Sequence, residues 1–247
     1  MRIFHFYPSG FSLLEVLLST ALFLLLFLFT MSVFQASKKQ NSLQRAGMES
    51  QSAAALSLDK IQTEASHAGL GLSRAIDLDL VSGIEISEGI LAVQSGTLSM
   101  TPPNDLFPGQ IWIALENTSP FKKGRVICLL NEDQGEAKTL LRVEKDGFEL
   151  DSSLSFTYRK DKTSLIAVET IMFYLEDHSG ILRRKVNNSP AQPLCHETET
   201  FECNYDPFNN LLSLKMKMRN KKERVYERCF FPKNMAPHRW AETEKIP

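Results

Sequence analysis

A run of 22 uncharged residues, from Val16 to Ser37, most limits what this chain can form. As an α-helix at about 1.5 Å per residue, the run is about 33 Å long, which matches the roughly 30 Å hydrocarbon core of a bilayer. From Phe11 to Phe34, 18 of 24 residues are apolar, whereas the whole chain is 43% hydrophobic with a formal net charge of −1. The sequence therefore predicts one membrane-spanning helix followed by a more polar domain, and it excludes a wholly disordered chain or a general polyanion binder.

A cleavable secretory signal is one interpretation of this run, but the run is too long for it. The apolar core of a signal peptide has roughly 7–15 residues and ends at a small-residue cleavage site, whereas a helical pattern continues beyond Ser37. An uncleaved single-pass anchor agrees better with the length. Neither interpretation explains Glu15, because a carboxylate inside a membrane helix costs about 2.5–3.5 kcal/mol at the bilayer centre.

The residues around Glu15 indicate a partner for its charge. The segment Ser9-Gly10-Phe11-Ser12-Leu13-Leu14-Glu15 resembles the processing site of type IV prepilins. The resemblance implies that prepilin peptidase cleaves between Gly10 and Phe11 and N-methylates Phe11, so that residues 1–10 are a leader peptide. Cleavage creates an α-ammonium at a helix N-terminus, where the helix dipole disfavours a positive charge. In the family, the glutamate at the fifth mature position, here Glu15, forms the assembly salt bridge with the amino terminus of a neighbouring subunit.

The resemblance implies a structural subunit and not an enzyme: a minor pilin or pseudopilin that joins, or primes the assembly of, a type IV pilus or a type II secretion pseudopilus. Its expected partners are the prepilin peptidase, other pilins or pseudopilins contacted through the N-terminal helix, and the inner-membrane assembly platform. We expect a single-pass inner-membrane protein whose C-terminal domain lies in the periplasm until the chain enters the filament. Lys38, Lys39 and Arg45 follow the span, and a count of positive charges alone would favour the opposite topology.

Helical periodicity continues beyond the span. Small and apolar residues recur at intervals of three and four from Leu43 to Ala68, as in an amphipathic helix. Gly69 and Gly71 predict its end, because glycine readily adopts the left-handed conformation that closes a helix. Residues 53–71 resemble the end of the N-terminal "spine" helix in PilW-type minor pilins and in J-type pseudopilins of type II secretion. We therefore expect a spine helix over residues 11–68, with a transmembrane half over 11–37.

The hydrophobic period changes from 3.6 to two after the glycines. Residues 212–218 alternate strictly between apolar and polar side chains, which predicts a half-buried strand. Apolar runs at 168–175 and 181–186 flank Asp177-His178-Ser179-Gly180, which predicts a hairpin. Prolines predict a loop over 95–109 and a frayed tail from about residue 232. The expected fold class is α+β: a long N-terminal hydrophobic helix packed on an exported antiparallel β domain over residues 69–247.

Four cysteines, Cys128, Cys195, Cys203 and Cys229, would lie in an oxidising compartment if the C-terminal domain is exported. Four cysteines allow three connectivities. Cys195 and Cys203 enclose a short polar loop and are the favoured pair, which leaves Cys128 to pair with Cys229. A zinc site is disfavoured, because the sequence has no CxxC motif and Cys195-His196 with Cys203 lacks a recognisable fourth ligand.

Nucleic-acid binding and catalysis find little support in the sequence. A basic cluster lies between Lys215 and Arg228, but Lys215, Lys217 and Arg219 fall on the solvent face of the predicted strand, and no aromatic residues interleave to stack bases. No Walker loop, GxSxG or HExxH motif occurs, and the five histidines are scattered. We expect no catalytic residues, metal or cofactor. The alternative function is a single-pass, signal-anchored exported enzyme or binding domain unrelated to pili.

Overall fold

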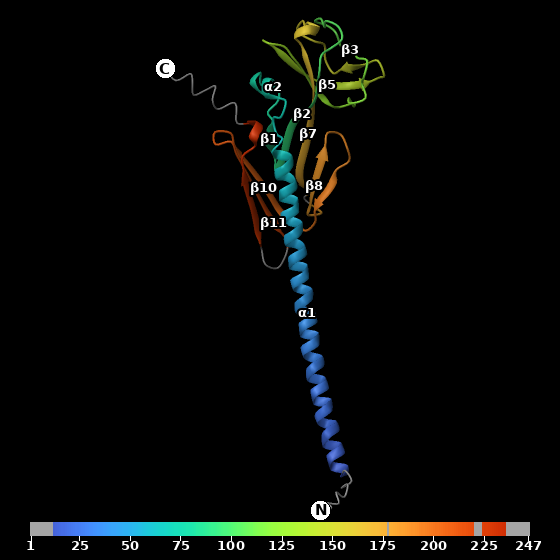
Figure 1. The fold of residues 1–247 in the computed structure, drawn as a ribbon, viewed down its shortest axis with the longest axis vertical. Helices are drawn as coiled ribbons and strands as arrows, with labels where there is room; N and C mark the ends of the chain where they lie inside the picture. The colour runs from blue at the N-terminus through green and yellow to red at the C-terminus, as the bar shows by residue number, and fades with distance from the viewer. Residues whose placement is uncertain (1–11, 177, 220–223, 236–247) are drawn as a thin grey trace, which may run out of the picture. The chain divides into compact units, whose positions relative to one another are not determined.

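The computed structural model describes residues 12–176, 178–219 and 224–235 (Figure 1). The chain divides into two compact units, Met1–Gln51 and Ser52–Pro247. One long helix, α1 (Leu13–Ala65), makes up nearly all of the described part of the first unit and is also the first element of the second. The rest of the second unit is built mainly from antiparallel strands. The predicted α+β class, with a long apolar N-terminal helix and an antiparallel β domain, is confirmed.

The C-terminal part of α1 forms the spine of the second unit. Its buried side chains recur at three- and four-residue intervals and are at most 1% exposed: Ala54, Leu58, Ile61 and Ala65. The helix ends at Ala65, three residues before the predicted end. The next residues turn through shorter bonds, in which the amides of His67 and Ala68 donate to the carbonyls three residues earlier. Gly69 and Gly71, with φ of 75° and 68°, then reverse the chain as the sequence indicates.

The larger sheet has nine strands, and every neighbouring pair is antiparallel. Its main path runs β1-β2-β7-β4-β5-β6-β3, while β8 pairs with β7 and β9 with β8. The strands are β1 (Ile84–Ser87), β2 (Ile90–Met100), β3 (Trp112–Ala114), β4 (Val126–Leu130), β5 (Gly135–Val143), β6 (Gly147–Leu150), β7 (Ser164–Glu176), β8 (Ile181–Val186) and β9 (Gln192–Cys195).

The 13-residue strand β7 organises this sheet. One edge of β7 pairs with β2, while its other edge pairs first with β4, through residues 164–167, and then with β8, through residues 171–176. The sheet therefore divides at β7 into one branch that continues to β3 and another that ends at β9. The predicted hairpin is the β7–β8 pair; of its turn residues, Asp177 lies outside the described residues.

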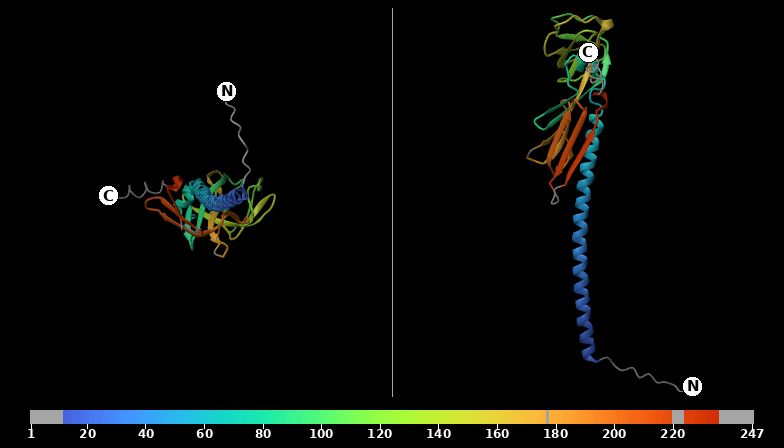
Figure 2. Two further views of the ribbon diagram at one scale, coloured as in Figure 1. Left: turned by 90° about the horizontal axis from the view of Figure 1, so that it is seen from below. Right: turned by 90° about the vertical axis from the view of Figure 1, so that its left-hand side faces the viewer.

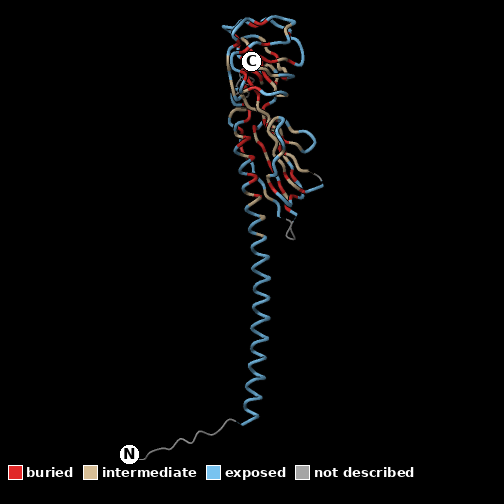
Figure 3. The backbone as a smooth tube through the Cα atoms, turned by 90° about the vertical axis from the view of Figure 1, so that its right-hand side faces the viewer, coloured by how far each residue is buried: buried red, intermediate tan, exposed pale blue. Residues whose placement is uncertain are grey.

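A second, three-stranded sheet packs against the same helix. It consists of β10 (Thr198–Asp206), β11 (Leu211–Met218) and β12 (Val225–Phe230), in that order (Figure 2). The alternation predicted for the central strand is confirmed, because its apolar side chains are at most 1% exposed: Leu212, Leu214, Met216 and Met218. These side chains share one hydrophobic core with α1 and with residues from β1, β2, β7, β8 and β9. The core of the second unit is thus built around the last turns of the helix (Figure 3).

Two further cores complete the second unit. One lies beneath β3, β5 and β6 and includes Phe148 and Tyr158, both fully buried. The other is closed by the short helix α2 (Ser73–Asp77), whose Ala75 packs near Cys128 of β4. Short 3₁₀ turns, η1 (Lys160–Lys162) and η2 (Lys233–Met235), occupy connecting segments.

Two local predictions are wrong. The predicted loop begins as strand, because β2 continues to Met100 by pairing with β7, with a register shift after Gly96 where the Gly96 amide donates to Leu70 O at 2.7 Å. The start of the predicted frayed tail is packed: Asn210 Nδ2 donates to Pro232 O at 3.0 Å, and Met235 contacts the main core. Residues 236–247 lie outside the described part of the chain.

Candidate functional site

The start of α1 brings Ser12 and Glu15 into reciprocal contact. Ser12 precedes the first helical residue, and its hydroxyl oxygen accepts a hydrogen bond from the Leu14 amide at 3.2 Å. Glu15 Oε2 in turn accepts a hydrogen bond from the Ser12 amide at 3.1 Å. This is a variant of the capping box, in which the Ser12 hydroxyl accepts from Leu14 and not from Glu15, and Ser-x-x-Glu satisfies two amides that a helix N-terminus leaves without partners. Gly10 and Phe11, the expected cleavage and methylation residues, lie outside the described residues.

The capping box gives Glu15 a structural role beyond the one that the resemblance to prepilins implies. The signal was visible, because Ser12 and Glu15 have the spacing of a capping pair. One of the two carboxylate oxygens, Oε2, accepts the hydrogen bond from the Ser12 amide. A carboxylate has room for further donors on its other oxygen, so the cap is compatible with a second, intermolecular partner. Its negative charge also complements the positive end of the helix dipole.

The helix beyond Glu15 exposes its apolar side chains on all sides. From Leu13 to Phe34, every large apolar side chain is at least 46% exposed (Figure 3). This is the one described helix that is long and apolar enough to cross a membrane, with a mean hydropathy of 2.5 in its most apolar window. The length, composition and N-terminal position of this helix are compatible with a single-pass membrane anchor.

Four hydroxyl side chains in the apolar part of this helix form hydrogen bonds with carbonyls of the helix itself. The hydroxyls of Ser19, Thr20, Thr30 and Ser32 each donate to a backbone carbonyl three or four residues earlier, at 2.8–3.0 Å. Such local bonds let hydroxyl residues sit in an apolar environment without leaving an unpaired donor. Glu15 is therefore the only charged group in the described residues before Lys38.

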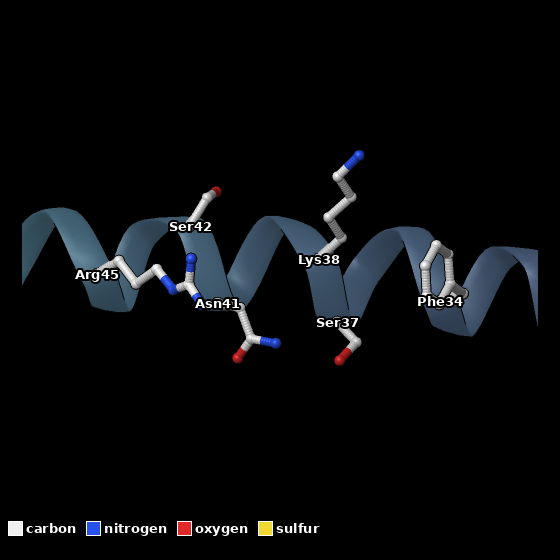
Figure 4. Close-up of a pocket in the computed structure, with 6 residues that line it drawn as sticks. All are labelled: Phe34, Ser37, Lys38, Asn41, Ser42 and Arg45. Carbon is white, nitrogen blue, oxygen red and sulfur yellow. The ribbon is translucent and has the colours of Figure 1, made fainter.

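A mainly polar stripe begins at the last apolar residue of the same helix segment, Phe34, and continues to Arg45. Figure 4 shows its members on successive turns of a single helix, so the stripe is an open surface and not an enclosed pocket: Phe34, Ser37, Lys38, Asn41, Ser42 and Arg45. Lys38 and Arg45 are exposed, and neither makes an ion pair with another described residue. The stripe is therefore a cationic surface at the end of the apolar segment.

The four cysteines are free thiols. Cys203 lies opposite Leu214 on β11, while Cys195 Sγ lies 3.9 Å from the sulfur of Met218, four residues further along that strand. Four residues of strand span about 13 Å, whereas a disulfide joins Cα atoms less than about 7 Å apart. The predicted Cys195–Cys203 pair is therefore wrong.

The second predicted pair is also wrong. Cys128 is fully buried in the core beneath α2, whereas Cys229 is exposed on β12, opposite Ser213 of β11. The two thiols thus lie in different sheets and different environments. Burial raises the pKa of Cys128 and of Cys203 to about 11, so both are protonated at neutral pH.

Two buried carboxylates, which the sequence did not single out, are held by structural partners. Glu64 of α1 accepts two bonds from Nε of Arg184 on β8, at 2.7 and 2.9 Å, and pairs with Lys60 at 2.8 Å. Glu136 of β5 accepts bonds from the amides of Ser155 and Phe156 and from the Tyr158 hydroxyl. All of these partners except Lys60 are more than fifteen residues away in sequence. Each of them donates a hydrogen bond or pairs its positive charge with the carboxylate. Both carboxylates therefore stabilise the fold by joining segments that are distant in sequence.

The basic cluster on the second sheet is largely neutralised. Lys215 lies 3.5 Å from Glu227, and Lys217 lies 3.1 Å from Glu199, across neighbouring strands. Arg228 pairs with Asp59 of α1 at 2.8 Å. Residues 220–223, which complete the cluster, lie outside the described residues. The described members of the cluster thus fit a solvated, charge-paired strand face.

The described residues show no group of three or more histidine, cysteine, aspartate or glutamate side chains that could hold a metal ion. Comparison with known proteins finds no match: no family model, no curated protein and no solved structure matches this chain.

Proposed function

We propose that this chain is a structural subunit of a pilin-like filament: a minor pilin or pseudopilin of a type IV pilus or a type II secretion pseudopilus. Prepilin peptidase cleaves it between Gly10 and Phe11 and methylates Phe11. The mature helix anchors the chain in the inner membrane, with the C-terminal domain in the periplasm, and later joins the filament through contacts with other pilins or pseudopilins. The inner-membrane assembly platform is a further partner, and no catalytic activity is assigned to the chain.

The observation that carries this proposal is the position of Glu15. It is the one acidic residue in the first turn of a helix that is otherwise uncharged to Ser37 and whose apolar side chains are exposed all round. A plain membrane anchor needs no charge for the cap, because glutamine also serves in a capping box, and a carboxylate penalises insertion. A subunit that must attract the amino terminus of a neighbour does gain, because the pairing restores neutrality in a medium where charge is expensive.

The second unit supports the same proposal. Ala54, Leu58 and Ile61 of α1 are part of its main core, and Glu64 is fastened to β8. The C-terminal turns of the helix are therefore an integral element of the β domain. Buried residues at the C-terminal end of the helix and exposed apolar residues at its N-terminal end support a subunit that carries a folded domain on an assembly helix.

Mass spectrometry of the N-terminus tests this proposal. In cells that contain prepilin peptidase, the mature chain is expected to begin at N-methylated Phe11; in matched cells without the peptidase, it is expected to begin at Met1. An intact Met1 terminus in both strains would overturn the proposal and favour the alternative, a signal-anchored exported enzyme or binding domain. Cleavage at a site other than Gly10–Phe11 would also contradict it.

A further inference from the structure

The basic residues that follow the apolar helix have no assigned role in assembly. Lys38, Lys39 and Arg45 are all exposed. No acidic residue occurs on the helix between Glu15 and Glu49, and none of the three cations makes an ion pair with a described residue. By contrast, the cations Arg184, Lys215 and Arg228 of the second unit are each paired with a carboxylate. The three cations therefore have no ion-pair partner among the described residues, and the nearest acidic residue after them on the helix, Glu49, lies four positions beyond Arg45.

The position of these residues defines the environment that they meet. Val16 to Ser37 spans about 33 Å, so Lys38 and Lys39 emerge at the edge of a roughly 30 Å hydrocarbon core. Arg45 is about 10 Å further along the helix and about 20° from Lys38 around its axis. The two cations thus lie on one face, and the polar headgroup layer is only about 5–7 Å thick on each side of the bilayer.

The direction of the Arg45 side chain brings its charged end closer to the headgroup layer than its backbone position. Cα–Cβ bonds in an α-helix tilt toward its N-terminus, which here is the membrane end. Figure 4 shows the Arg45 side chain extended along the helix toward Asn41, in the direction of Phe34. Long basic side chains commonly place their apolar stems against apolar surface and their charged ends among headgroups. Arg45 is therefore directed back toward the level that Lys38 and Lys39 occupy.

We propose that Lys38, Lys39 and Arg45, together with the amide of Asn41, bind the phosphates of acidic phospholipid headgroups at the membrane surface where the helix emerges after Ser37. This contact fixes the depth of α1 in the bilayer, and it explains why cations follow a span whose topology they would otherwise oppose. The inference rests on the membrane-anchored part of the proposed function and is independent of cleavage at Gly10. It commits to lipid, because a second copy of this helix offers only Glu15 and Glu49 as described counter-charges up to Gln51.

Native mass spectrometry of the full chain, released from bilayers of phosphatidylglycerol and phosphatidylcholine, tests this proposal. The wild-type chain is expected to retain phosphatidylglycerol above its bulk proportion, with each cation contributing up to roughly fivefold in affinity for an acidic membrane. The Lys38→Gln/Lys39→Gln/Arg45→Gln variant is expected to retain the two lipids in their bulk ratio. Glutamine has nearly the helix propensity of lysine and arginine, so circular dichroism of this variant should match the wild type.

The matched control removes the same charge from the second unit. Lys122, Lys123 and Lys145 are exposed, and the Lys122→Gln/Lys123→Gln/Lys145→Gln variant is expected to keep the wild-type lipid preference. The proposal would be overturned if the Lys38→Gln/Lys39→Gln/Arg45→Gln variant kept the wild-type enrichment of phosphatidylglycerol. It would also be overturned if the control variant lost this enrichment to the same extent. A third contradictory result would be that the Lys38→Gln/Lys39→Gln/Arg45→Gln variant keeps the lipid preference but no longer self-associates in pure phosphatidylcholine. That result would assign the cations to contacts with a second copy of the chain. The experiment uses unprocessed chain, so its result stands whether or not prepilin peptidase cuts at Gly10.

Discussion

Arg184 of β8 joins Glu64 of α1 through Nε, which donates to both carboxylate oxygens at 2.7 and 2.9 Å. The two residues are 120 positions apart, and the Glu64 side chain is only 8% exposed. Burial raises the pKa of Glu64, but the hydrogen bonds from Arg184 and Lys60 outweigh this effect and hold that pKa below its ordinary value. The carboxylate therefore stays charged in the interior and attaches the helix to the larger sheet.

Replacing Arg184 alone should lower the free energy of unfolding more than replacing Arg184 and Glu64 together. Arg184→Met leaves Glu64 buried without its main partner, which we expect to lower the free energy of unfolding by about 3–5 kcal/mol. The Glu64→Met/Arg184→Met double variant should recover most of this loss, because two apolar side chains can fill the same space. Urea unfolding of the full chain in detergent measures both values.

The control for this prediction is a second ion pair between α1 and a strand. Asp59 and Arg228 are also joined at 2.8 Å, but their side chains are 55% and 46% exposed. Arg228→Met should therefore cost at most about 1 kcal/mol. If Arg184→Met costs no more than Arg228→Met, Glu64 does not depend on Arg184.

The elements that the sequence predicted well are those coded by neighbouring residues. Strict alternation over 212–218 gave β11, and Gly69 and Gly71 indicated the end of the helix within a few residues. The strand character of residues 95–100 is not predicted, because the prolines that follow favour a loop over 95–109, and only pairing with distant β7 extends the strand to Met100. Prolines likewise suggested a free tail at 232–235, where contacts with Asn210 and Ser66 hold the chain in place.

In the candidate site too, the features set by neighbouring residues could be predicted, and those set by distant residues could not. The motif around Glu15 is contiguous, so its chemistry could be inferred from the sequence. The cysteines could not be paired from spacing, because the distance between Cys195 and Cys203 is set by the register of β10 on β11. Glu64 and Glu136 resembled ordinary surface acids, since their burial depends on partners that are mostly far away in the chain.

Stability should fall as the pH falls below about 5, and Glu136 should account for part of the loss. Burial raises the pKa of Glu136, but hydrogen bonds from Lys138 and from the amides of Ser155 and Phe156 outweigh it, so its pKa is lowered on folding. A lowered carboxylate pKa contributes stability above the unfolded-state pKa, and this contribution is lost as the pH falls through the folded-state value. Glu136→Gln should therefore be less stable than wild type at pH 7 and show a flatter profile from pH 7 to 3.

Unfolding measurements across this pH range check the prediction. Glu116 is exposed, so Glu116→Gln should keep the wild-type profile. Parallel profiles for Glu136→Gln and wild type would show that this carboxylate does not contribute to the acid sensitivity. Glu64, which has the same direction of shift, should leave a residual slope in the Glu136 variant.

Cys229 should be the thiol that reacts first in the native protein. It is exposed on β12, whereas Cys128 and Cys195 are at most 2% exposed and burial raises the pKa of Cys203 to about 11. The thiolate is the reactive form, so a brief maleimide treatment should label one site, which peptide mapping should place at Cys229. Cys229→Ser should abolish this fast labelling. Denatured, unreduced protein should expose four reactive thiols; two or none would show that disulfides form after all.

The two tasks of Glu15 can be separated by its charge. Glu15→Gln keeps an oxygen that can accept the Ser12 amide, because glutamine also serves in a capping box, but it removes the negative charge. Ser12→Ala keeps the charge and removes the hydroxyl that accepts the Leu14 amide, at an expected cost of about 1 kcal/mol to the helix end. Under the proposed function, Glu15→Gln should reach the membrane in normal amounts but enter filaments at least about tenfold less, as expected for the loss of a charge-assisted contact worth about 1.5–3 kcal/mol. Ser12→Ala should assemble nearly as well as wild type. The ratio of sheared-filament to membrane-bound protein measures this difference, and the opposite order of the two variants would assign Glu15 to capping alone.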